Sequence, residues 1–287
     1  MDLVGLKIFK AVAEQGGITR AAAALHRVQS NVTTRVKQLE ARLGTKLFSR
    51  QGRRLVLSSE GKVLLAYADR LLQLSAEAQA ALKGHAPHGA LKIGALESTA
   101  ATRLPPILAR YHRAYPAVRL ELATGTTGAL VDKVLRGEAE AAFVAEPFSA
   151  KNLETRHAFT EELVLITPKG HPRVTTPKQL GHRTILAFTT GCAYRRRLEA
   201  WLGRSSVVAE RVMEYGSYHA IVACVAAGSG IAVVPRSVLR AVGAQEQVAV
   251  HSLPANVAHA KTMLVWRRGY QSSALDALRE ELERAKR

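Results

Sequence analysis

The sequence of 287 residues predicts a mixed fold class: an N-terminal helical part that carries a β-hairpin, then a long helix, then a larger α/β part. Three observations carry this prediction. Short helical patterns meet at a tight turn before residue 29, β-prone runs flank Gly52, and strand and helix patterns alternate from residue 90 to residue 266. A chain of this length favours more than one hydrophobic core.

The first two predicted helices lie at residues 3–15 and 20–25. Two glycines follow the first helix and can end it in a left-handed conformation, and Thr19 is a suitable N-cap for the second. A short turn at residues 26–28 then leads to a third helix. Two helices joined by so tight a turn indicate a helix-turn-helix, whose second helix lies in the major groove of DNA.

The third helix runs from residue 29 to Gly44, with Gln29 or Ser30 as its cap, and one face is dense in hydrogen-bonding side chains. Short polar side chains can read base edges: glutamine pairs with adenine, and asparagine, serine or threonine bonds bases or contacts a thymine methyl group. Arginine and lysine there would contact phosphates. An ordinary solvated helix face is the alternative. The candidate DNA-binding residues on this helix are Gln29, Ser30, Asn31, Thr33, Thr34, Arg35 and Lys37.

The runs on either side of Gly52 predict a hairpin with Arg50, Arg53 and Arg54 near its tip, the wing of a winged helix-turn-helix. The charge of the chain favours a polyanionic partner. The formal net charge is +18, and residues 1–88 hold 14 Lys and Arg against 6 Asp and Glu, net +8. The rest of the chain holds 27 against 17, net +10 over more than twice the length. This denser positive charge at the N-terminus indicates nucleic acid as the partner there.

A long helix is predicted over residues 59–83, followed by a hinge at 83–89. Its apolar stripe recurs every three or four residues with no neighbouring helix evident to cover it, which is typical of a helix that pairs with a second copy of itself. Packing against the chain's own core is the alternative. The stripe consists of Leu64, Leu65, Ala68, Leu71, Leu72, Ser75, Ala78 and Leu82. This apolar stripe predicts a homodimer, because a protein that binds two symmetry-related half-sites of DNA needs two-fold symmetry itself.

Beyond the hinge, alternating patterns indicate an α/β architecture with helices on both faces of a sheet. Strands are predicted at 90–96, 118–124, 139–145, 162–168, 184–188, 231–235 and 261–266. Helices are predicted at 103–114, 127–136, 194–202 and 218–227. This part of the chain is long enough for two such sheets.

Residues 6–61 read "LKIFKAVAEQGGITRAAAALHRVQSNVTTRVKQLEARLGTKLFSRQGRRLVLSSEG", and further segments read "RLPPILARYHRAYPAVRLEL", "ELVLITPKGHP", "GCAYRRRLEAWL" and "AIVACVAAGSGIAVVPRSVL". In these segments the chain resembles the LysR-type transcriptional regulators over nearly its whole length. By position, Gln29, Ser30, Asn31 and Thr33 fall on that family's base-reading helix and Arg53 on its wing. The chain departs from the family pattern at Ser30, where proline is frequent, and at Thr34, where a basic residue is frequent. The missing charge at Thr34 predicts a shifted DNA preference.

The resemblance implies a winged helix-turn-helix domain at 1–58, a linker and dimerisation helix with a hinge at 59–88, and an effector-binding domain at 89–287. That last domain would have two lobes like those of the periplasmic binding proteins, lobe I at about 89–162 and 266–287 and lobe II at about 163–265. The resemblance also implies dimers that assemble into homotetramers on interrupted palindromes of double-stranded DNA. A small-molecule effector in the C-terminal domain would change the binding or bending of that DNA.

Four hydroxyl residues follow predicted strands in the α/β part. Ser98 and Thr99 lie in a loop between a strand and a helix, and Thr126 and Thr127 follow Gly125 in a similar arrangement. Ligands of open α/β sheets bind beyond the carboxyl ends of strands, and helix N-termini attract anions. These two loops therefore predict an effector site, with simple helix capping as the alternative for each residue.

A second set of candidates lies on the far lobe. Thr189, Tyr194 and Arg195 follow another strand and could face the same cleft, where an arginine would bind a carboxylate. Ser217 and Tyr218 open a further helix and complete the set. Together these residues predict a small anionic or zwitterionic metabolite as the effector, with no cofactor.

The two cysteines, Cys192 and Cys224, carry an alternative function. Arginines and a helix start near Cys192 could lower the pKa of its thiol and make the chain a redox-sensing regulator, although Cys224 lies in an apolar run. The histidines show no metal-ligand spacing, and no P-loop, G-x-S-x-G or paired catalytic carboxylate stands out, so no metal, catalytic site or enzyme is predicted. There is no signal-peptide pattern, and the apolar stretch at 220–234 is too short to span a bilayer. A cytoplasmic protein without a membrane partner is expected.

Overall fold

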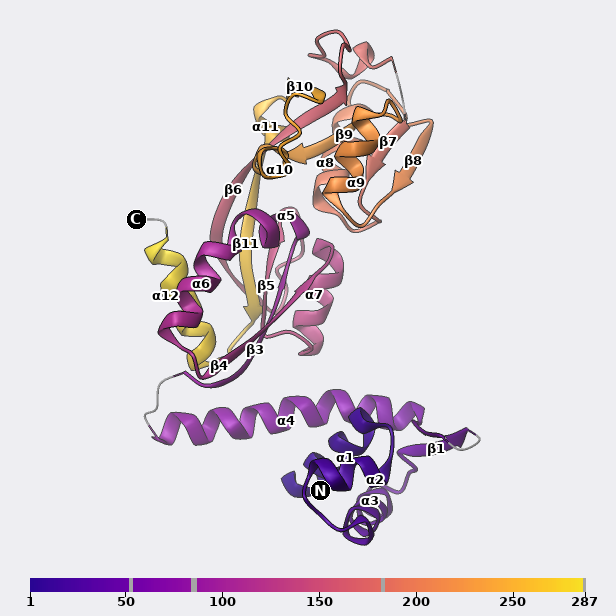
Figure 1. The fold of residues 1–287 in the computed structure, drawn as a ribbon, viewed down its shortest axis with the longest axis vertical. Coiled ribbons are helices and arrows are strands. Elements are labelled where there is room, and N and C mark those ends of the chain that lie inside the picture. The colour runs from indigo at the N-terminus through magenta and orange to yellow at the C-terminus, as the bar shows by residue number, and fades with distance from the viewer. Residues whose placement is uncertain (52–53, 84–86, 182–183, 286–287) are drawn as a thin grey trace. The chain divides into compact units, whose positions relative to one another are not determined.

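The computed structural model describes residues 1–51, 54–83, 87–181 and 184–285, and the chain divides into two units, Met1–His85 and Ala86–Arg287 (Figure 1). Each unit has its own hydrophobic core. The first unit is helical with one hairpin and the second is an α/β unit, which confirms the predicted fold class. The long helix α4 (Ser59–Lys83) belongs to the first unit, so a separate linker segment at 59–88 stays a prediction.

Three short helices, α1 (Leu3–Gln15), α2 (Ile18–Ala24) and α3 (Gln29–Leu43), open the first unit. The Asp2 side chain caps α1 by accepting a hydrogen bond from the backbone N–H of Gly5 at 2.7 Å. Gly16 and Gly44 end α1 and α3 in the left-handed region, with φ of 63° and 67°. The C-terminal ends of α1 and α3 therefore lie where these glycines predicted them.

The starts of α2 and α3 differ from the prediction. Helix α2 begins after Gly17, so Thr19 lies inside the helix instead of capping it. Helix α3 begins after Val28 without a side-chain cap. Gln29 and Ser30 therefore lie in the first turn of α3, where neither is the cap and both side chains are exposed to solvent.

Two apolar clusters hold the first unit together. One consists of Ile8, Val12, Ala21, Ala22, Val32 and Val36, and the other of Leu6, Phe9, Leu39, Leu47 and Ala68. At the end of α3 the carboxylate of Glu40, 8% exposed, accepts hydrogen bonds from the backbone N–H of Leu47 at 2.9 Å and from Nζ of Lys46 at 3.0 Å. These contacts bury the apolar side of α3 and fix the turn that follows it.

The predicted hairpin is confirmed. Strands β1 (Phe48–Gln51) and β2 (Arg54–Leu57) pair antiparallel, with Gln51 opposite Arg54. The start of α4 passes so close to this hairpin that a Cβ on Gly61 would lie 2.1 Å from the carbonyl oxygen of Leu47. Only glycine allows that approach, which fixes the hairpin against α4.

The apolar stripe of α4 has a partner within the unit, contrary to the prediction that no helix covers it. Helix α1 packs on α4, where Ala68 is fully buried and Lys10 of α1 pairs with Asp69. Leu64, Leu65, Leu71 and Leu72 are partly buried against the same cluster. A different apolar set on α4 is open to solvent: Val63, Tyr67 and Leu74 are 60%, 55% and 61% exposed.

The second unit is built on a seven-stranded sheet in the order β10-β6-β11-β5-β3-β4, with β9 also paired to β6. Its strands are β3 (Gly89–Ala95), β4 (Val118–Thr124), β5 (Ala141–Ala145), β6 (Leu153–Pro168), β9 (Ala232–Pro235), β10 (Val248–Ser252) and β11 (His259–Arg267). A parallel pair, β7 (Thr184–Ala187) and β8 (Arg211–Glu214), adjoins β9 through a bridge from Ile185 to Ile231.

Helices form two groups in this unit (Figure 1). Those with β3, β4 and β5 are α5 (Glu97–Thr102), α6 (Leu104–Ala114), α7 (Thr127–Arg136) and α12 (Ser273–Arg284). Those with β7 to β10 are α8 (Ala193–Gly203), α9 (Tyr218–Ala226), α10 (Arg236–Val242) and α11 (Ala255–Ala258), with a 3₁₀ turn at Pro177–Gln179. We call the first group lobe I and the second group lobe II.

The long strand β6 runs through both lobes. Its first part, as far as Glu162, pairs with β11, and its second part, from Leu163, pairs with β9 and β10. Strand β11 pairs with β5 from Thr262 to Trp266. The second segment of lobe I therefore includes β11 from Thr262 onward and begins a few residues before the boundary at about 266 that the sequence predicted.

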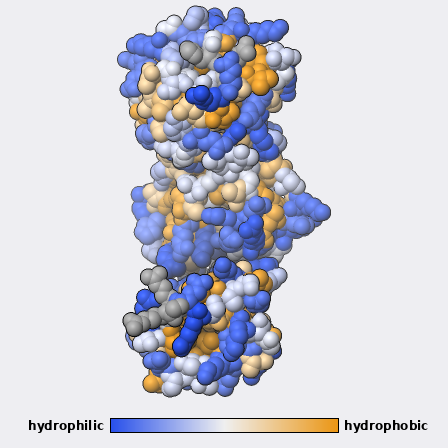
Figure 2. Space-filling model, turned by 90° about the vertical axis from the view of Figure 1, so that its right-hand side faces the viewer, coloured by the Kyte–Doolittle hydropathy of each residue, from blue (hydrophilic) through white to orange (hydrophobic). Residues whose placement is uncertain are grey.

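No described helix is long and apolar enough to cross a membrane. The apolar stretch at 220–234 instead supplies α9 and β9, and Ile221, Val225 and Val234 are buried. Figure 2 shows hydrophilic residues over most of the face that it presents, with hydrophobic residues in smaller patches.

Candidate nucleic-acid interface and ligand cleft

The polar side of α3 is open to solvent. Val32, Val36 and Leu39 on the opposite side are buried, at 0%, 7% and 3% exposure. Thr33 is half-buried and donates its hydroxyl to the carbonyl oxygen of Gln29 at 2.9 Å. The remaining candidates, Gln29, Ser30, Asn31, Thr34, Arg35 and Lys37, are exposed. The helix is thus anchored by one side and presents donors and acceptors on the other, as a major-groove helix must.

Val28 adds to this surface, and the sequence did not reveal it. Its side chain is 74% exposed directly before α3. The sequence predicts it as part of the turn at residues 26–28, and in the structure Val28 directly precedes the helix with its side chain in solvent. An exposed apolar side chain at this point could contact a thymine methyl group.

The hairpin carries its candidate arginines beside α3. Arg50 lies on β1 opposite Leu55 and is exposed, and Arg54 begins β2. Arg53 lies outside the described residues. The antiparallel register places positions 50 and 54 near the tip, the position at which a wing contacts phosphates.

A small cavity lies between the two lobes of the second unit. Its volume is about 20 Å³, which is room for about one water molecule. It is lined by Leu96, Glu97, Gly125, Thr126, Phe188, Cys192, Ala193, Tyr194 and Tyr218. An adjoining cavity of about 10 Å³ shares four of these residues and also contacts Arg195. The predicted candidates Thr126, Tyr194 and Tyr218 therefore lie together, on segments from both lobes.

Ser98 and Thr99 do not lie in a loop, as predicted, but within the six-residue helix α5. Both are 1% exposed, and neither hydroxyl has a hydrogen-bond partner among the residues that the structure describes. The sequence missed their neighbour Glu97, which opens α5 and lines the cavity. Its signal was an acidic residue directly after the apolar run that forms β3.

The two threonines at α7 differ in role. Thr126 caps the helix, accepting a hydrogen bond from the backbone N–H of Ala129 at 3.4 Å, and also lines the cavity. The Thr127 hydroxyl is 3.3 Å from both the backbone nitrogen and the carbonyl oxygen of Ala145. Thr127 is thus engaged in joining α7 to β5, a role that is neither the predicted ligand contact nor the helix cap given as its alternative.

Lobe II approaches α7 through the loop before α8. The backbone N–H of Gly128 donates to the carbonyl oxygen of Gly191 at 3.4 Å. Gly191 has φ of 97°, and a Cβ there would lie 3.0 Å from the hydroxyl oxygen of Thr126. In the same loop Thr189 is exposed and does not line the cavity. Ser217 is half-buried at the start of α9 and makes no capping hydrogen bond.

Aromatic side chains form the lobe II wall. The rings of Phe188 and Tyr218 lie with centroids 4.6 Å apart, and Tyr194 and Tyr218 are 3% and 4% exposed. Burial raises the pKa of both tyrosines well above the ordinary range. The hydroxyl of Tyr194 lies near those of Ser98 and Thr262, but the described residues offer it no well-formed hydrogen bond.

Arg195 is already paired, contrary to its predicted role as a free cation for a carboxylate. Its guanidinium donates to Glu199 at 2.7 Å, to Glu214 at 2.5 Å and to the carbonyl oxygen of Phe188 at 3.4 Å. Hydrogen bonds to the two carboxylates raise the pKa of Arg195. With two anionic partners in place, this side chain has little charge left for an effector.

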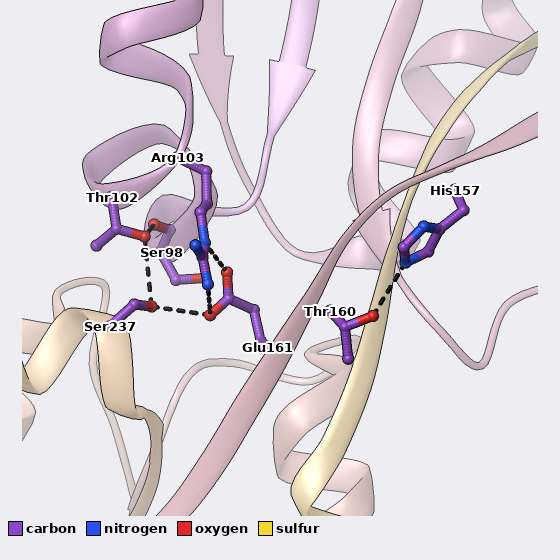
Figure 3. A network of polar contacts seen from close by, with 7 residues as sticks. All are labelled: Ser98, Thr102, Arg103, His157, Thr160, Glu161 and Ser237. Carbon is purple, nitrogen blue, oxygen red and sulfur yellow. Dashed lines mark hydrogen bonds and ion pairs between the residues drawn. The ribbon is translucent and has the colours of Figure 1, made fainter. Parts of the chain in front are cut away.

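A polar network around the buried carboxylate of Glu161 links the two lobes (Figure 3). Glu161 of β6 is 2% exposed and accepts hydrogen bonds from Nε and Nη2 of Arg103 at 2.6 and 3.2 Å, and from the hydroxyl of Ser237 at 2.8 Å. Arg103 precedes α6 in lobe I, and Ser237 lies on α10 in lobe II. Thr102 donates to the carbonyl oxygen of Ser98 at 2.8 Å, which links this network to α5.

Two family models match the chain. Residues 3–62 match the bacterial regulatory helix-turn-helix protein, lysR family, and residues 84–287 match the LysR substrate binding domain. The chain belongs to the LysR family of transcriptional regulators. The HTH-type transcriptional regulator YusT of Bacillus subtilis (strain 168) is 42% identical over 277 residues, which cover 96% of this chain and 93% of YusT. This LysR-type regulator is thus a DNA-binding transcriptional regulator with an effector-binding domain.

Solved structures share the fold of this LysR-type regulator. A full-length OxyR variant from Pseudomonas aeruginosa matches with a TM-score of 0.76 at 24% identity, over 99% of this chain and 95% of that chain. Full-length CbnR complexed with its target DNA matches with a TM-score of 0.68 at 23% identity, over 99% and 100%. At these sequence identities the two matches show a shared fold and nothing more specific.

The environment of Cys192 in this LysR-type regulator does not favour a reactive thiol. Burial raises the pKa of Cys192, and backbone hydrogen bonds and the charges of Arg195 and Arg196 offset only part of that rise. The predicted lowering of this pKa is therefore wrong. In the described part of the chain, no group of three or more His, Cys, Asp or Glu side chains is arranged to hold a metal ion.

Proposed function

We propose that this LysR-type regulator reads double-stranded DNA through the exposed side of α3, with the β1–β2 hairpin as its wing. The observation that carries the proposal is that α3 is anchored by its apolar side and left uncovered on its polar side. Gln29, Ser30 and Asn31 in the first turn contact base edges. Arg35, Lys37 and the wing arginines contact phosphates and supply affinity without sequence information.

The proposed assembly is a homodimer through α4, two of which form a homotetramer on an interrupted palindrome. The exposed apolar residues Val63, Tyr67 and Leu74 support this pairing, since the other stripe packs from Leu64 to Leu72 against the unit's own core. Two-fold symmetry would present two α3 helices to two half-sites. The regulator would act in the cytoplasm.

The proposed signal is a small molecule held in the cavity between the lobes of the effector-binding domain. The cavity is lined from both lobes, so a ligand there would bind the open and closed arrangements with different affinity. That difference would change how the regulator binds or bends DNA. The sequence predicted an anionic or zwitterionic metabolite. The paired state of Arg195 removes the main support for a purely anionic one.

Fluorescence anisotropy with the DNA upstream of the regulator's own gene tests the proposal. We expect selective binding over a shuffled duplex and an affinity that falls steeply with salt, as phosphate contacts require. Asn31→Ala should reduce selectivity, and Gln247→Ala on the exposed surface of the second unit serves as its control. Binding that is equal on both duplexes, or absent, would contradict the proposal.

A further inference from the structure

The cavity between the lobes has an unusual charge balance for a chain of net charge +18. Of the described residues that line it, Glu97 alone carries a formal charge, and that charge is negative. Two arginines of this domain are engaged elsewhere: Arg195 pairs with Glu199 and Glu214, and Arg103 pairs with Glu161, while His219, which lies near Glu97, is exposed and does not line the cavity. The cavity thus offers an anion to a ligand and no free cation from its described lining.

The carboxyl group of Glu97 is incompletely satisfied. The backbone N–H of Tyr218 and the ring of His219 lie near it, but Oε2 is buried and has no hydrogen-bond partner within the described residues. Burial raises the pKa of Glu97. A buried carboxylate oxygen without a donor destabilises the protein, and a ligand that brings a donor would remove that cost.

The rest of the cavity suits the same ligand. Phe188 and Tyr218 present packed aromatic rings beside Glu97, and aromatic faces attract cations as well as alkyl groups. Tyr194, 3% exposed, also lines the cavity, and its hydroxyl, which lies near those of Ser98 and Thr262, has no well-formed hydrogen bond to any described residue. It is a second buried polar group that a ligand could satisfy, independent of the carboxylate.

We propose that the effector carries a protonated amino group and that Glu97 is the residue that binds it, with Phe188 and Tyr218 packing against the adjoining carbon atoms. The proposal rests on the proposed effector function of this cavity and narrows it to amines and amino acids. A volume of about 20 Å³ does not hold such a molecule, so the walls separate when it enters. The ion pair with Glu97 then provides the differential affinity that favours the occupied arrangement.

Matched pairs of small molecules that differ by one amino group test the proposal on the full-length protein. The pairs are L-leucine and 4-methylpentanoate, and 4-aminobutanoate and butanoate. Thermal-shift measurements identify the pairs that bind, and calorimetry gives their Kd values. We expect the amino member to bind roughly ten- to hundredfold more tightly, the factor that a charged hydrogen bond supplies.

Glu97→Gln keeps the size of the side chain and removes its charge. We expect this variant to lose the preference for the amino member, to melt at or above the temperature of the unliganded wild type, and to keep its affinity for DNA. Glu246→Gln, the same change at an exposed site on the second unit, should leave the preference intact. A purely structural role for Glu97 predicts the reverse, a lower melting temperature and unchanged ligand preference.

The outcomes separate this inference from the function on which it rests. If members without the amino group bind as well, or if Glu97→Gln retains the preference, the inference is overturned while effector binding stands. If no compound of either kind changes the melting temperature or the affinity for DNA, both the inference and the proposed effector function are contradicted. DNA binding itself is measured separately and is affected by neither result.

Discussion

The α3 surface and the cavity between the lobes hold their polar groups in opposite states. On α3 all candidate side chains except the half-buried Thr33 are exposed, so water satisfies them when no DNA is bound. In the effector-binding domain, Tyr194 of the cavity lining and Ser98 and Thr99, which follow Glu97 in α5, are buried, and no described residue completes their hydrogen bonds. An unsatisfied buried polar group costs on the order of 1–3 kcal/mol. The polar groups of the α3 surface therefore do not destabilise the unbound protein. The buried hydroxyls of the effector-binding domain do, and a ligand that supplies their missing hydrogen bonds would remove that cost.

The largest effect is expected where a buried polar group of the effector-binding domain does have its partner. Arg103→Met would leave the carboxylate of Glu161, 2% exposed, with the Ser237 hydroxyl as its one donor among the described residues. We expect the domain to lose about 2–3 kcal/mol of unfolding free energy, less than for a fully buried pair because Arg103 is itself 36% exposed. Calorimetric unfolding of the full chain measures this loss.

Lys46→Met is the matched control in the first unit. Glu40 there is also buried, but Lys46 is 79% exposed, and the backbone N–H of Leu47 remains as a donor when the lysine is removed. We expect a loss below about 1 kcal/mol. Equal losses in the two variants would show that neither the burial of the cation nor the supply of other donors decides the cost.

The next effect concerns DNA and leaves stability alone. Asn31→Ala removes an exposed side chain from the first turn of α3, so the melting temperature should stay within about 1 °C. The free energy of binding to the cognate duplex should weaken by about 1–3 kcal/mol, while that of binding to a shuffled duplex stays the same. Lys37→Ala should instead weaken both and reduce the salt dependence. A stability loss in Asn31→Ala would show that the α3 surface is not independent of the core.

Much of the fold follows from local patterns. Gly16 and Gly44 end their helices where φ is positive, and the predicted strands in the α/β part are found within about two residues at each end, except that β6 begins at Leu153, nine residues before its predicted start. Short elements were missed because their signals are short: α5 has six residues, and its Ser-Thr content is typical of a loop. The covering of α4 by α1 was missed because Lys10 and Asp69 are far apart in sequence.

The residues of the candidate sites were also predictable from the sequence only in part. Polar residues at the start of α3 are predictable, since helix periodicity shows which side is apolar. The partners of Arg195 and Arg103 are not, because Glu214 and Glu161 come from other segments that only the folded chain brings near. Glu97 was visible in the sequence beside Ser98, but its importance depends on what surrounds it, which is an aromatic wall from the other lobe.

A smaller effect is expected from pH. His251 of lobe II is 6% exposed; its Nδ1 accepts the backbone N–H of Val174 at 3.2 Å, and Nε2 lies 2.9 Å from the Thr167 hydroxyl. Burial, followed by the neighbouring His171, lowers the pKa of His251 below its ordinary value of 6.5. The unfolded chain therefore binds the proton more readily, so this contribution to stability is complete above about pH 6.5 and declines as the pH falls below it. His251→Gln should flatten that decline in unfolding free energy, and His112→Gln, at an exposed site, should not.

The smallest effect is the most direct test of the comparison between the two regions. Ser98→Ala removes a buried hydroxyl for which the described residues provide no partner, so the folded protein loses no hydrogen bond. We expect the unfolding free energy to stay the same or to rise by up to about 1 kcal/mol, because the desolvation cost of the hydroxyl disappears. Ser272→Ala is the control, since the Ser272 hydroxyl caps α12 and lies 3.4 Å from the Glu140 carboxylate, and its removal should cost about 1 kcal/mol. If Ser98→Ala is as damaging as Ser272→Ala, the Ser98 hydroxyl is hydrogen-bonded in the folded protein and a ligand can recover no free energy from it.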